Sequence, residues 1–197
     1  MRLAVAIFCC ALYSDALSAA PAALPDWKQP EVAYSATRIE RVMGIEKSQT
    51  IYFDQGRERS EEIIQGALYV SIYSPEDKSL YVFFVPGDVK VERACMDFAG
   101  LYSSAKSEGR IKSEVIGRET VLGEKVTKHR VESLDGRRWY TSFMWVTDDG
   151  IVMRSVNAKG GFEFELSDLK RGLQPSELFE LPEGIEVVPD PAFCGHD

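Results

Sequence analysis

The residues of this sequence that commonly do chemistry are few and scattered. Histidine occurs twice, as His129 and His196. His129 lies in a segment that reads as a strand and has no evident acid or nucleophile partner, so a structural role is expected for it. Glu163 and Glu165 are spaced to lie on one solvated face of a strand, which does not place them on two sides of a scissile bond.

Motifs with a defined chemistry are also missing from the sequence. It contains no Gly-x-Ser-x-Gly elbow, no His-Glu-x-x-His pair and no phosphate-binding loop. The terminal Cys-Gly-His-Asp offers two or three metal ligands, too few for a closed site. We therefore expect no enzymatic activity, no catalytic residue, no metal and no cofactor.

The first 22 residues have the pattern of a signal peptide. A positive Met1-Arg2 precedes an apolar run over residues 3–13, and small residues follow over 18–23. Cleavage is expected after Ala22, or else after Ala19. A spanning helix needs roughly 20 apolar residues, so we expect no transmembrane segment in the mature chain, and a single domain over residues 23–197.

Two of the four cysteines remain after such a cleavage, Cys95 and Cys194. An even number of cysteines in an oxidising compartment favours one disulfide. The alternative is two separate buried thiols.

The formal net charge of the whole chain is −8. Nucleic-acid binding requires a basic footprint, so no nucleic-acid partner is expected. Simple adsorption to anionic lipid headgroups is disfavoured for the same reason.

The stretch from Arg138 to Leu166 predicts three successive antiparallel strands. Turn residues at Asp148-Asp149-Gly150 and Lys159-Gly160-Gly161 separate segments rich in aromatic and β-branched residues. A two-residue first loop would give odd positions of the first strand and even positions of the second a common face. That face would carry Trp139, Phe143, Trp145, Val152, Arg154 and Val156.

The second loop decides which residues of the third strand join this face. A three-residue loop would add Phe162, Phe164 and Leu166, whereas a two-residue loop would add Glu163 and Glu165. The apolar pattern favours the three-residue loop.

Strands with short turns account for most of the remaining chain, and one helix is expected at about residues 93–107. Its apolar stripe is Cys95, Phe98, Ala99 and Tyr102, at spacings of three and four. Residues 175–188 read as a short helical turn and an edge segment. The fold class is therefore mainly β (α+β), an antiparallel curved sheet or half-barrel closed over that helix.

Four segments in order resemble the periplasmic lipoprotein-carrier (LolA-like) superfamily, especially a branch of exported bacterial proteins. They are Gly56–Glu61, Ile116–Gly123, Trp145–Arg154 and Pro175–Gly184. The resemblance implies a periplasmic half-barrel closed by helices around a cavity that accepts acyl chains. It also implies that Arg57 or Arg59 matches an arginine near the mouth of that cavity.

The expected function is to bind or carry a lipid or other hydrophobic ligand between the sheet and the helix. The aromatic face named above, with Phe162, Phe164, Arg57 and Arg59, would supply the ligand contacts, because such a surface requires a cover. The alternative is a non-enzymatic protein-interaction module, an envelope sensor or accessory subunit, whose cavity is only core.

Overall fold

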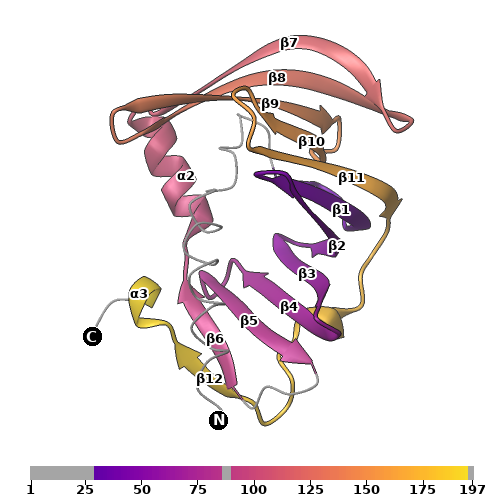
Figure 1. The fold of residues 1–197 in the computed structure, drawn as a ribbon, viewed down its shortest axis with the longest axis vertical. Coiled ribbons are helices and arrows are strands. Elements are labelled where there is room, and N and C mark those ends of the chain that lie inside the picture. Colours follow the sequence, from indigo (N-terminus) through magenta and orange to yellow (C-terminus); the bar gives the residue numbers. More distant parts are fainter. Residues whose placement is uncertain (1–28, 86–89, 195–197) are drawn as a thin grey trace.

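The computed structural model describes residues 29–85 and 90–194. The predicted signal peptide and His196 lie outside these residues. Twelve strands form one sheet, which curves into an open arc (Figure 1).

The first six strands form an antiparallel meander, and the bounds of the elements are as follows. The meander contains β1 (Tyr34–Val42), β2 (Ile45–Asp54), β3 (Arg57–Ile64), β4 (Ala67–Ser74), β5 (Ser79–Val85) and β6 (Lys90–Cys95). After α2 (Phe98–Ser107), a second meander contains β7 (Ile111–Val121), β8 (Glu124–Asp135), β9 (Arg138–Thr147), β10 (Val152–Asn157) and β11 (Phe162–Arg171). The chain ends with η1 (Ser176–Phe179), β12 (Glu186–Pro189) and α3 (Pro191–Cys194).

Antiparallel pairing of β1 with β11 joins the two meanders into the order β12-β6-β5-β4-β3-β2-β1-β11-β10-β9-β8-β7. Among the strands that the structure describes, only β12 pairs in parallel, with β6. Two-residue turns join β1 to β2, β2 to β3 and β3 to β4. At Met43-Gly44 both residues have positive φ, as tight hairpins require. The predicted fold class is confirmed, because strands dominate and the sheet is curved and almost entirely antiparallel.

The helix begins later than the sequence pattern predicted. The segment Lys90–Cys95 is strand β6, and α2 starts at Phe98. Asp97 fixes this start, because its carboxylate accepts a hydrogen bond from the backbone N–H of Gly100 at 2.8 Å. The expected start at residue 93 is therefore wrong, while the end at 107 is confirmed.

The sheet has a concave and an outer face. Helix α2 lies on the open side of the arc (Figure 1), and its Phe98 ring contacts Tyr73 with centroids 5.0 Å apart. Directly opposite residues in antiparallel strands share a face, so the register places Glu58, Phe53 and Tyr34 on this concave face too.

The C-terminal segment covers part of the outer face. Phe179 is buried, and Leu181 and Ile185 pack against a cluster on β4, β5 and β6 made of Val70, Ile72, Phe83 and Val91. A disulfide joins Cys95 at the end of β6 to Cys194 in α3, which confirms the predicted pair. Among the described residues, no helix has the length and apolar character needed to cross a membrane.

Candidate ligand-binding face

The register of β9 and β10 confirms part of the predicted aromatic face. Trp145 lies opposite Arg154, and Phe143 lies opposite Val156. Trp139 occupies the same alternate set of positions on β9, near the start of the strand, where 42% of its surface is exposed.

Val152 does not belong to that face. It lies opposite Val146, and the register shifts by one residue between Val152 and Arg154. Val152 instead packs against a cluster that contains Met144 and Val146. The first turn has three residues between the paired ends Thr147 and Ile151, and the bulge after it restores the predicted register only from Arg154 onward.

Phe162 and Phe164 also lie on the other face. Four residues, 158–161, separate β10 from β11, and Glu163 lies opposite Val156 while Phe164 lies opposite Ser155. The expected three-residue loop is therefore wrong. A loop with an even number of residues places Glu163, not Phe164, beside Val156.

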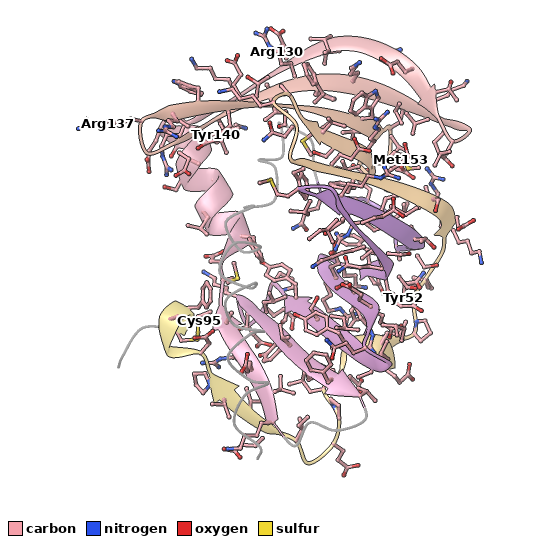
Figure 2. The ribbon with its side chains drawn as sticks, in the orientation of Figure 1. Tyr52, Cys95, Arg130, Arg137, Tyr140 and Met153 are labelled. Atoms are coloured by element: carbon pink, nitrogen blue, oxygen red, sulfur yellow. A yellow bond between two sulfur atoms is a disulfide. The ribbon has the colours of Figure 1, made fainter. Side chains whose placement is uncertain are left out.

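The face of Trp145 is the outer face of the arc. Arg130 lies opposite Phe143, and its side chain projects from the outside of the sheet (Figure 2). Helix α2 lies on the concave side, so the predicted cavity between the helix and Trp145 is wrong. The two phenylalanines of β11, Phe162 and Phe164, project into the concave side instead.

Charged groups surround Trp145 on the outer face. Its indole N–H donates to Glu119 Oε2 at 2.9 Å, and Lys128 Nζ lies 4.7 Å from its ring centroid. The guanidinium of Arg154 lies 5.1 Å from the same ring. Hydrogen bonds from Trp145 and Lys128 hold the pKa of Glu119 below its usual value. These contacts already occupy the ring, and they do not form a site for an alkyl chain.

Arg57 and Arg59 hold the C-terminal segment and do not stand at a cavity mouth. The guanidinium of Arg57 lies 4.5 Å from the ring centroid of Phe179. Arg59 Nη1 donates to the carbonyl oxygen of Leu178 at 2.9 Å. Arg59 lies opposite Ile72 on the outer face, so the position that the resemblance implied for these arginines is wrong.

A polar strip crosses the middle of the concave face, and the sequence analysis missed it. Arg38 Nη1 donates to Glu58 Oε1 at 3.2 Å, and Nη2 donates to Gln49 Oε1 at 3.0 Å. Arg38 Nε lies 3.1 Å from Glu40, and Gln49 Nε2 donates to Glu62 at 3.1 Å. Burial alone would lower the pKa of Arg38, but Glu58 and Glu40 raise it above its usual value.

The sequence signal for this strip was the alternation of side chains along β1. Tyr34, Ala36, Arg38, Glu40 and Val42 alternate along the strand and share the concave face. Two charged residues within an otherwise apolar set mark a polar element inside a buried surface. The same parity places Gln49 beside Arg38 on β2.

Apolar groups flank the polar strip on both sides. On the side of the second meander lie Phe164 and Leu166 of β11, with Met144 of β9 beyond them. On the other side, Tyr69 contacts Phe84 with ring centroids 5.1 Å apart. The strip thus separates two apolar surfaces on one curved sheet.

Two hollows open elsewhere on the surface. One of about 130 Å³ lies between the Met43-Gly44 turn and the Gly160-Gly161 turn, beside Phe162. The other, about 350 Å³, lies along the β7–β8 hairpin next to Asp148. Neither hollow is lined by Arg38 or Phe164. Among the described residues, no group of three or more histidine, cysteine or acidic side chains is placed to hold a metal ion.

No protein-family model and no curated protein matches the sequence. The structure of PNGF-II has a TM-score of 0.50 and 11% identity, over 81% of this chain and 31% of the PNGF-II chain. This chain therefore spans less than a third of PNGF-II. At such identity the likeness concerns the fold alone.

Two other solved structures resemble the chain. The MucA/MucB complex of Pseudomonas aeruginosa has a TM-score of 0.47 and 14% identity, over 81% of this chain and 59% of that one. The lipoprotein LppX of Mycobacterium tuberculosis has a TM-score of 0.42 and 11% identity, over 71% of this chain and 88% of that one. The structure contains the curved sheet with a helix on its open side that the sequence resemblance implies.

Proposed function

We propose that this protein is an exported, periplasmic binding protein for an amphiphilic ligand, which lies on the concave face of the sheet. The observation that carries the proposal is the polar strip around Arg38, set between two apolar surfaces of the same face. An alkyl chain has apolar contacts beside Phe164 and Leu166. A polar headgroup finds hydrogen-bonding partners at Glu40 and Glu58.

The physical argument rests on the cost of burying charge. A partly buried arginine and its carboxylates contribute little net stability, because desolvation offsets much of their attraction. Replacing such a network with apolar residues is often neutral or stabilising, so stability alone is a weak reason for its presence. Recognition of a headgroup does give a reason, because ligand sites are mostly apolar with a few placed polar groups.

The disulfide and the N-terminal pattern support export. Disulfides persist in oxidising compartments and are rare in the cytosol, and Cys95 and Cys194 are bridged. The signal-like residues 1–22 would deliver the chain to the periplasm.

Two measurements test the ligand proposal. Native mass spectrometry of protein purified from its periplasm should show a bound amphiphile. The neutral fluorophore N-phenyl-1-naphthylamine should bind saturably, and Phe164→Glu on the concave face should weaken its binding. The matched change Phe143→Glu, on the outer face, should leave binding unchanged in folded protein. Absence of saturable binding to the folded wild type would refute the proposal.

One observation favours a protein partner as the second candidate function. Strand β7 is the last in the sheet, and within the described part of the chain no strand pairs with its outer edge. It exposes Val115 and Ile116. An open edge with apolar side chains can accept a strand from another protein. Backbone amides of β7 that become protected from hydrogen exchange in a periplasmic extract would support this candidate, and unchanged exchange would argue against it.

A further inference from the structure

We infer that the polar group of the ligand is a protonated amine and not a phosphate or carboxylate. The inference rests on the proposed function and specifies the chemistry of the same site. It follows from which atoms of the polar strip are already occupied and which remain able to bind.

Protein acceptors already surround the guanidinium of Arg38. Each of its three guanidinium nitrogens has an acceptor within 3.3 Å, from Gln49, Glu58 or Glu40. A phosphate or carboxylate that approached this arginine would also approach Glu40 and Glu58. Like charges at such distances repel, and the repulsion grows where water is partly excluded. Arg38 is therefore a poor receptor for an anionic headgroup.

Carboxylates outnumber cations on this part of the face. Glu40, Glu58 and Glu62 share the face with Arg38, and Lys47 lies opposite Glu40 at the edge of the strip. One negative charge is left in excess. Each carboxylate has two oxygens with room for several donors, and the contacts around Arg38 and Gln49 use one oxygen each of Glu40, Glu58 and Glu62. Within the described part of the chain, the other oxygens of these three carboxylates make no hydrogen bond to Arg38 or Gln49, and they favour a ligand group that donates hydrogen bonds and carries positive charge.

Ser155 gives a second, independent indication of a ligand. Its side chain is fully buried, and its Oγ has no hydrogen-bond partner among the described residues. It lies opposite Phe164, which in turn lies opposite Glu40, so Ser155 and Glu40 share one row of the concave face. A buried hydroxyl without a partner costs free energy. A ligand whose amine lies across β11, between Glu40 and Ser155, would supply that partner; its alkyl chain could not.

Displacement of bound N-phenyl-1-naphthylamine from the full-length mature protein by matched probes tests the inference. Dodecylamine, dodecanol and dodecanoate share one chain length and differ in their headgroups. At neutral pH, the dissociation constant of dodecylamine obtained from this displacement should be at least about tenfold lower than that of dodecanol or dodecanoate. A tenfold ratio is what we expect for one favourable charge contact. Glu58→Gln should remove most of that preference, whereas Glu165→Gln on the outer face should preserve it.

The outcomes separate this inference from the proposed function. If dodecanoate or dodecanol binds at least as tightly as dodecylamine, the amine assignment is overturned. The protein would then still be an amphiphile-binding protein. A preference for dodecylamine that Glu58→Gln and Glu40→Gln both leave intact would overturn the assignment to this strip. If the fluorophore itself fails to bind saturably, the proposed function fails as well.

Discussion

Arg38 and Glu58 are 20 residues apart in the sequence and meet on the concave face, with Nη1 3.2 Å from Oε1. The contact passes from β1 to β3 across β2, where Gln49 accepts from the same guanidinium. One arginine therefore ties three neighbouring strands together. It also determines the chemistry of the face on which we place the ligand.

Replacing Arg38 by methionine should destabilise the protein by about 1–3 kcal/mol, because Glu40 and Glu58 lose their shared partner. The estimate is reduced for solvent screening, since the Glu58 side chain is 36% exposed. Urea unfolding measures the change. Arg41→Met is the matched control on β1. This exposed arginine pairs with Glu46 and Glu163 in solvent, so its loss should cost much less than the loss of Arg38. Equal losses from the two variants would contradict this account of Arg38.

Trp145→Phe should raise the pKa of Glu119 toward its usual value, because the variant lacks the indole N–H that donates to the carboxylate. A folded-state pKa below the unfolded value means that Glu119 stabilises the protein above the unfolded-state pKa. This contribution is lost as pH falls through the folded-state pKa. Carbon-detected NMR titration of Glu119 measures the shift. Trp139→Phe should leave it unchanged, and a shift of equal size there would exclude the indole as the cause.

Removing the disulfide should lower the free energy of unfolding by about 2–5 kcal/mol, because the bridge closes a long loop in the unfolded chain. Cys95 and Cys194 are 99 residues apart. The comparison is between wild type and the double variant Cys95→Ser/Cys194→Ser in urea. Reductant should bring the wild type to the stability of the double variant and leave the double variant unchanged. A wild type that reductant does not affect would contradict a stabilising bridge.

Phe179→Ala should cost about 3–5 kcal/mol, because this side chain is only 9% exposed and anchors the C-terminal segment under Arg57. Phe193→Ala is the control, since Phe193 is 37% exposed in the same part of the chain. Chemical denaturation compares the two. Small, similar losses would mean that the segment from η1 to β12 contributes little to the fold.

The sequence predicted the strands well because turn residues and alternating side chains are local signals. The two hairpins around β10 show where that information ends. One extra residue in the turn over residues 148–150 reverses Val152 until the bulge at Met153 restores the register, and one additional loop residue, Ala158, reverses Phe164. Successive side chains of a strand alternate between the two faces of the sheet. An error of one residue in the register therefore places a side chain on the opposite face.

The candidate site was harder to predict because its residues are distant in sequence. Arg38, Gln49 and Glu58 lie on three strands, and only the register of β1, β2 and β3 shows that they meet. The aromatic residues of β9 were the stronger local pattern. They belong to the outer face, where Lys128 and Arg154 contact the ring of Trp145.

The central claim, that a ligand lies on the concave face, is tested most directly by photochemical cross-linking. Amphiphiles with a diazirine in the alkyl chain, made with an amine and with an uncharged headgroup, would be bound, irradiated and located by peptide mass spectrometry. We predict that competable labelling falls on concave-face residues, which are Phe164, Leu166, Tyr69 and their neighbours on that face. Labelling confined to Phe143, Trp145 and Val156 on the outer face would contradict the account. Labelling that excess unlabelled amphiphile does not reduce would contradict it as well.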